Sequence, residues 1–80
     1  MTKKSISFSL VARQSGERST RVIAVDDDGK ITWCFDIPDA SDEFTQLESD
    51  EAVVKAWSWF GYLYTLGSED GELLSTEFVK

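Results

Sequence analysis

Residues 57–63 read WSWFGYL, and the fold of this chain depends on how these seven residues are arranged. The stretch holds two tryptophans, a phenylalanine, a tyrosine and a leucine, in a chain of 80 residues with a formal net charge of −7. A chain this short buries only about 60% of the surface that it exposes when unfolded, so every large apolar side chain matters to the core. The stretch is therefore expected to supply the core, a binding surface, or both.

The sequence around this stretch has the spacing of an amphipathic helix. When residues from 52 onward are placed at 100° per residue, the apolar side chains fall on two adjacent rows and the polar ones on the opposite side. Ser49 can cap such a helix and Gly67 can end it. Gly61 costs about 1 kcal/mol inside a helix. We predict a main helix between these ends, preceded by a short helix or turn over residues 42–48.

The first half of the chain has the period of two that is typical of strands. Residues 5–13 alternate between apolar side chains and serines, residues 21–25 are rich in β-branched side chains, and residues 31–37 alternate again. Asp28-Gly29 is a hairpin signal, and Pro38 ends the last strand because it has no N–H to donate. These features predict a three-stranded antiparallel meander.

A candidate fourth strand covers residues 72–79, with Leu74 and Phe78 turned inward. The predicted fold is therefore α+β and a single domain over residues 1–80. It comprises a three- or four-stranded antiparallel sheet with one main amphipathic helix, and a short preceding helix, packed on one face.

Cysteine content and hydrophobic runs favour a cytoplasmic protein. Cys34 is the single cysteine, which excludes an internal disulfide, and its mid-strand position predicts a small apolar role. The residues after Lys3-Lys4 only superficially resemble a secretion signal, because serine interrupts them at every second position. The apolar run over residues 52–66 contains Lys55 and is shorter than the roughly 20 residues that a membrane span needs. We expect no membrane association.

Acidic side chains are the remaining candidates for chemistry, because the chain has no histidine. The run from Asp26 to Gly29 is out of register with a calcium-binding loop, which would place its first acid at Ala24 and its last at Phe35. A pair for acid–base catalysis could come from Asp36, Asp39, Asp42 or Glu43, but so thin a core leaves little room for a catalytic pocket. We therefore expect no enzymatic activity, no metal and no cofactor.

Charge is distributed unevenly along the chain. Residues 1–30 hold six basic and four acidic side chains, a net of +2, whereas residues 31–80 hold two basic and eleven acidic ones, a net of −9. An acidic surface disfavours direct nucleic-acid binding, which needs clustered Lys and Arg, and it attracts a partner protein with a basic surface.

Acids and surplus aromatic side chains coincide in the second half, which predicts a partner-binding surface. Its predicted residues are Asp42, Glu43, Glu48, Glu51, Trp57, Tyr62 and Tyr64. Small size and high acidity are similar in kind to phage- or mobile-element-encoded inhibitors such as anti-CRISPR proteins and DNA mimics, which implies occlusion of a basic site on a host nucleic-acid-handling protein. Two alternatives stay open: an immunity or accessory protein that binds a small protein such as a toxin, and a homodimer that buries its aromatic edge.

Overall fold

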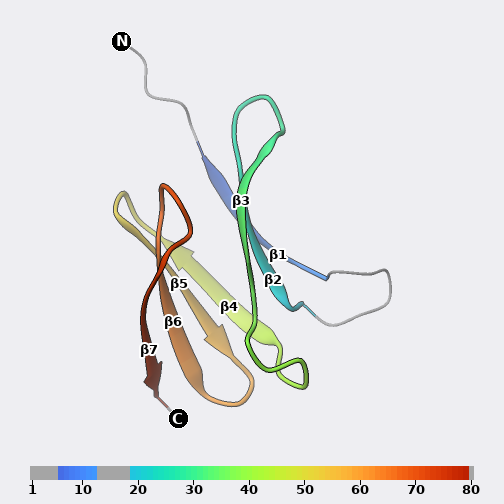
Figure 1. The fold of residues 1–80 in the computed structure, drawn as a ribbon, viewed down its shortest axis with the longest axis vertical. Helices are drawn as coiled ribbons and strands as arrows, with labels where there is room; N and C mark the ends of the chain where they lie inside the picture. Colours follow the sequence, from blue (N-terminus) through green and yellow to red (C-terminus); the bar gives the residue numbers. More distant parts are fainter. Residues whose placement is uncertain (1–5, 13–18, 80) are drawn as a thin grey trace.

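The computed structural model describes residues 6–12 and 19–79, and in these residues every regular element is a β-strand (Figure 1). The strands form two antiparallel sheets, one of three strands in the order β1-β2-β3 and one of four in the order β4-β5-β6-β7. Their bounds are β1 Ser7–Val11, β2 Arg21–Val25, β3 Ile31–Asp36, β4 Phe44–Ser49, β5 Val53–Ser58, β6 Tyr62–Gly67 and β7 Leu73–Phe78. The α+β prediction is wrong.

The three-stranded sheet contains the meander that the alternating sequence predicts. Ala24 at its centre pairs with Phe8 of β1 and Trp33 of β3. The predicted β2–β3 hairpin turn is also present, and Asp26 holds it by accepting the N–H groups of Asp28 and Lys30 at 2.9 and 3.0 Å. Residues 5 and 13, the predicted ends of the first strand, and the turn that follows it lie outside the described residues.

The predicted main helix is instead the β5–β6 hairpin. Its two strands are joined by Trp59, Phe60 and Gly61, and the N–H of Gly61 donates to the carbonyl of Ser58 at 3.0 Å. Gly61 has φ 101°, a left-handed conformation that glycine adopts without a steric cost. The Ser58 hydroxyl accepts the N–H of Tyr62 at 3.1 Å, so the residues on both sides of the turn support it. A tight turn with glycine at its last position explains why the chain reverses here.

The helical interpretation failed because both faces of this hairpin are apolar. Val54, Ala56 and Leu66 are buried on the inner face, while Trp57 and Leu63 pair with each other on the outer face. Apolar side chains on both faces also fill a wide arc when they are plotted at the helical angle. The two apolar rows of the helical projection therefore arise from the two faces of a strand and not from one face of a helix.

Two further elements differ from the prediction. Residues 42–48 do not form a short helix, because residues from Phe44 onward belong to β4, and Ser49 pairs with Val54 instead of capping a helix. The predicted fourth strand exists as β7, but it pairs with β6 in the second sheet. Leu74 and Phe78, expected to be buried, are 53% and 65% exposed.

The core lies between the two sheets and is dominated by aromatic rings. Phe35 of β3 contacts both Phe44 and Tyr64, with ring centroids 6.4 and 5.8 Å apart. Trp33 donates its indole N–H to the carbonyl of Ser68 at 3.0 Å, which attaches the first sheet to the β6–β7 turn. The three-stranded sheet does not cover all four strands of the second sheet, however. Every residue of β7 is exposed.

Two predictions about the first sheet also need correction. Cys34 is exposed and does not fill a small apolar site in the core. Ile31, predicted on the buried side of its strand, is 60% exposed. Both residues lie on β3, which is an edge strand of the three-stranded sheet. The alternation there correctly predicts a strand, but the strand is only partly covered by the other sheet.

Candidate functional site

Five carboxylates gather at one end of the molecule, on the two turns that join β4 to β5 and β6 to β7. They are Asp50, Glu51, Glu69, Asp70 and Glu72, and we call this region the acidic end. The strand order explains why they lie together. In an antiparallel sheet with the order β4-β5-β6-β7, the β4–β5 and β6–β7 turns lie at one end and the β5–β6 turn lies at the other. Residues about 20 positions apart in sequence therefore share one surface.

Backbone and side-chain hydrogen bonds hold these two turns together. Ser68 donates its N–H to the carbonyl of Ala52 at 3.1 Å and its hydroxyl to the carbonyl of Glu51 at 2.9 Å. Asp50 accepts the N–H groups of Ala52 and Val53 at 2.8 and 2.9 Å. These bonds to Val53 and Ala52 lower the pKa of the Asp50 carboxyl below its ordinary value. The turn thus favours an ionised Asp50.

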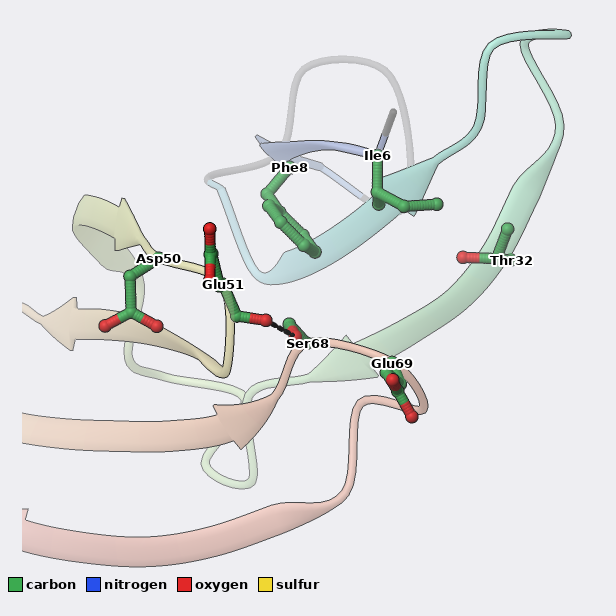
Figure 2. Close-up of a pocket in the computed structure, with 7 residues that line it drawn as sticks. All are labelled: Ile6, Phe8, Thr32, Asp50, Glu51, Ser68 and Glu69. Carbon is green, nitrogen blue, oxygen red and sulfur yellow. Dashed lines mark hydrogen bonds between the residues drawn. The ribbon is translucent and has the colours of Figure 1, made fainter. Parts of the chain in front are cut away.

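A cleft of about 320 Å³ opens between these turns and the first sheet (Figure 2). It is lined by Ile6, Phe8, Thr32, Asp50, Glu51, Ser68 and Glu69, and we call it the acidic cleft. In Figure 2 the side chains of Phe8 and Ile6 form one wall and the turn residues lie opposite. The ring of Phe8 packs against the ring of Trp33, with 5.8 Å between the ring centroids. The cleft therefore combines an apolar wall with a carboxylate rim.

This combination suits a cationic side chain with an apolar stem. Lysine and arginine bury their methylene groups along apolar surface and keep the charged head at the edge. An aromatic ring such as Phe8 also attracts a cation that lies over its face. Glu51 and Glu69 supply opposite charge at the rim of the same cleft.

The opposite end of the second sheet presents aromatic side chains. Trp59 and Phe60, at the tip of the β5–β6 hairpin, are 63% and 39% exposed. Asp42 holds this tip, since its Oδ1 accepts the N–H of Phe60 at 2.9 Å and that of Glu43 at 2.8 Å. The carbonyl of Glu43 in turn accepts the N–H of Trp59 at 2.8 Å. The tip is therefore tied to the β3–β4 connection.

The structure separates the acids that the sequence grouped together. Asp42 is fully buried and Glu43 is partly buried beside the aromatic tip. Glu51 is exposed at the acidic end, and Glu48 is exposed on β4, where it pairs with Lys55. Because β4 separates Glu43 from the β4–β5 turn, only Glu51 of these four lines the acidic cleft.

The predicted aromatic residues also divide. Tyr62 is 37% exposed and stacks edge-on with Phe78, whose ring centroid is 5.5 Å away. Trp57 is partly buried on the outer face of β5. Tyr64 is only 4% exposed, and its burial, with the charge of nearby Asp42, raises the pKa of its phenol. Tyr64 therefore belongs to the core and does not present a binding surface.

Carboxylates near Pro38 have local structural contacts. Asp36 forms an ion pair with Arg21, with 2.6 Å between Oδ1 and Nε, and this hydrogen bond raises the pKa of Arg21. Asp39 accepts the N–H of Ser41 at 2.9 Å. Across residues 6–12 and 19–79, no three acidic or cysteine side chains are grouped to hold a metal ion.

Six residues that line the acidic cleft were not predicted from the sequence as site residues, namely Ile6, Phe8, Thr32, Asp50, Ser68 and Glu69. In the predicted helix between Ser49 and Gly67, Asp50 lies at the start and Glu69 lies beyond the end, so nothing placed them together. The available signal was the pair of similar acidic turn sequences, SDE at 49–51 and SED at 68–70, that flank the β5–β6 hairpin. Once the hairpin is recognised, its register brings these two turns together.

The fold and the cleft define a two-sheet antiparallel β domain with an acidic end. The chain belongs to the family described as a domain of unknown function (DUF7957), whose sequence model matches residues 3–78. No curated protein matches the chain. Among the described residues, no helix is long and apolar enough to cross a membrane.

Proposed function

We propose that this protein is a non-enzymatic binding domain whose acidic cleft binds basic side chains of a partner protein. The observation that carries the proposal is a cleft lined both by the apolar side chains of Ile6 and Phe8 and by Glu51 and Glu69. A purely solvating acidic surface needs no such apolar lining. The joined turns support the proposal further, because a preformed site loses little conformational entropy on binding.

The partner class that we favour is a host protein that handles nucleic acid, which this domain inhibits by occupying the phosphate-binding surface. Such surfaces carry clustered arginine and lysine, and their attraction to phosphate depends on charge. The net charge of −7 speeds encounter with a basic surface. The cytoplasm is the compartment where such an inhibitor acts, and the exposed thiol of Cys34 is compatible with a reducing environment.

Binding to a defined probe tests the cleft. The probe is a short peptide with two arginines between leucines, titrated into ¹⁵N-labelled protein at low salt. We expect the largest amide shifts at Glu51, Ser68 and Glu69, and an affinity that falls as salt rises. The double variant Glu51→Lys/Glu69→Lys is expected to lower the affinity at least about tenfold, equivalent to about 1.4 kcal/mol.

A matched control separates the cleft from the overall charge. Asp27→Lys/Glu48→Lys makes the same change in net charge on two exposed residues that do not line the cleft, and it is expected to keep most of the affinity. If both double variants weaken binding equally, attraction to net charge explains the binding and the cleft has no special role.

Competition tests the partner class. Partners captured on immobilised protein are expected to be released by duplex or single-stranded DNA and to be lost with Glu51→Lys/Glu69→Lys. A partner that depends on the cleft but ignores nucleic acid would favour the immunity or accessory role instead, for example toward a toxin.

A further inference from the structure

The outer edge of β7 has no neighbouring strand among the residues that the structure describes. Edge strands expose unpaired N–H and C=O groups, and proteins usually protect them with lysine, proline or a bulge. Residues 73–78 read LLSTEF and contain neither lysine nor proline, and the bulge in β7 lies at its start, at Leu74, so that the strand from Ser75 onward has none of these protections. Figure 1 places β7 at the margin of the second sheet, on the side away from β4. This edge is therefore open to another strand.

The register of β7 determines which backbone groups face outward. Val79 donates its N–H to the carbonyl of Gly61 at 2.8 Å, and Phe78 pairs with Tyr62. Antiparallel ladders alternate between hydrogen-bonded and non-hydrogen-bonded pairs. The backbone groups of Thr76 and Phe78 consequently point away from β6, whereas Leu74 lies in the bulge where the register shifts. Thr76 and Phe78 can therefore pair with another antiparallel strand.

The side chains along this edge form an exposed apolar surface, which we call the β7 surface. Its members are Tyr62 (37% exposed), Leu73 (42%), Leu74 (53%), Phe78 (65%) and Val79 (48%). An aromatic side chain offers roughly 150–250 Å² when fully exposed, so Tyr62 and Phe78 together leave about 200 Å² exposed on each chain, and Leu73, Leu74 and Val79 add to this area. A stable interface buries about 800 Å² per partner, of which more than half is apolar. The β7 surface therefore supplies a substantial part of the apolar area that a dimer interface needs.

We propose that two copies of this chain pair through β7 in antiparallel orientation, around a two-fold axis at Thr76. This register places Ser75 opposite Glu77 of the second copy, and it brings Phe78 of one copy to the bulged start of β7 in the other, at Leu73 and Leu74. No carboxylate faces another across the axis. The second copy also adds apolar side chains beside Phe78 and Tyr62, which the three-stranded sheet leaves exposed.

Electrostatics favours this orientation. Each chain carries a formal net charge of −7, so association is stable only where the acidic ends lie far apart. Antiparallel pairing sets the turn with Glu69 and Asp70 of one copy beside the aromatic end of the other. The two acidic clefts then lie at opposite extremes of one eight-stranded sheet, and both remain open.

Light scattering after size exclusion tests the pairing directly. The full chain is expected to have twice the mass of one copy. Thr76→Pro removes an outward N–H without removing a bond to β6, and Leu74→Lys/Phe78→Lys places four cations at the interface. Each variant is expected to weaken dimerisation at least about tenfold. The matched control is Ile31→Lys, which removes an exposed apolar side chain from the edge strand of the other sheet and is expected to stay dimeric.

Amide hydrogen exchange identifies the interface even where a variant fails to fold. In the wild-type protein, protection at Thr76 and Phe78 is expected to increase with protein concentration. Three outcomes overturn the proposal: a wild-type monomer at every concentration, a dimer in which these amides stay unprotected, and a dimer that survives in both variants. A monomer whose β7 amides become protected only when a different protein is added would assign the edge to that protein.

Discussion

At the scale of single residues, Asp42 shows how a carboxylate can serve the fold although its charge suggests a surface role. It is fully buried, and its Oδ1 holds the N–H groups of Glu43 and Phe60. Its Oδ2 is buried and has no hydrogen-bond partner among the residues that the structure describes. Buried polar groups are stabilising only while their bonds are made, so the position should be sensitive to truncation. The Asp42 side chain therefore holds the tip of the β5–β6 hairpin through the N–H of Phe60.

Asp42→Ala is expected to lower the free energy of unfolding by about 2–4 kcal/mol, because two backbone N–H groups lose a charged acceptor. Urea unfolding followed by tryptophan fluorescence measures the loss. Asp27→Ala is the control, since this exposed turn residue should change stability by less than about 0.5 kcal/mol. Equal effects of the two substitutions would show that Asp42 does not hold the tip.

Asp50 makes the stability of the β4–β5 turn depend on pH. Its carboxylate accepts hydrogen bonds from Val53 and Ala52, and the pKa of the folded state lies below the ordinary value of 3.8. The stabilisation is therefore fully present above that value and is lost as the pH falls through the lower folded pKa. The difference in unfolding free energy between wild type and Asp50→Ala is expected to be largest at neutral pH and to shrink under acidic conditions. A difference that is constant or grows on acidification contradicts this assignment.

At the scale of elements, the β5–β6 hairpin decides the fold. It forms because Gly61 takes a left-handed conformation at the end of the turn and because Ser58 accepts two N–H groups around it. The same residues in a helix would expose Ser58 on one side and tolerate Gly61 only at a cost. Local turn chemistry and strand pairing on both sides therefore override the helical periodicity.

Gly61→Ala separates the two structures by the sign of its effect. In the hairpin, alanine at φ 101° is strained and is expected to lower the unfolding free energy by about 1–2 kcal/mol. In a helix the same change would raise it by about 1 kcal/mol. Thermal unfolding followed by circular dichroism measures the sign. Gly29→Ala calibrates backbone strain alone, because φ there is 81° and no atom lies within 4 Å of the added Cβ.

At the scale of the whole molecule, the acidic turns and the aromatic hairpin tip lie at opposite ends of the second sheet. The acidic end carries Asp50, Glu51 and Glu69, and the aromatic end carries Trp59 and Phe60. This separation permits two independent contacts, one through the acidic cleft and one through the β7 surface. A domain with both contacts can present two clefts on one dimer.

Net charge predicts how salt affects stability. A formal charge of −7 opposes the compact state by self-repulsion, and a Debye length of about 8 Å at physiological ionic strength screens most of it. The unfolding temperature is therefore expected to rise between low and physiological salt, equally in sodium and potassium chloride. Asp27→Lys/Glu48→Lys changes the net charge from −7 to −3, since each reversal adds two charges, and should reduce the rise. An unfolding temperature that falls with salt would contradict the repulsion.

Features that depend only on neighbouring residues could be predicted from the amino-acid sequence. Alternation from Ile6 to Leu10 and from Ile31 to Phe35 predicted strands, and Asp28-Gly29 predicted their hairpin, because side-chain direction and turn geometry are local properties. The sequence also determined the acidic character of the second half. The exposure of Tyr62 was predicted, although on a helix and for the wrong reason.

The elements that the second half of the chain forms, and the burial of its side chains, depend on tertiary contacts. WSWFGYL satisfies both a helical and a two-sided strand pattern, and the pairing of β5 with β4 and β6 selects the strand. Burial of Tyr64 and exposure of Phe78 depend on where the first sheet ends, since three strands cannot cover four. The acidic cleft likewise joins residues from β1 and two distant turns. Such contacts between residues far apart in sequence leave no local pattern from which they could be predicted.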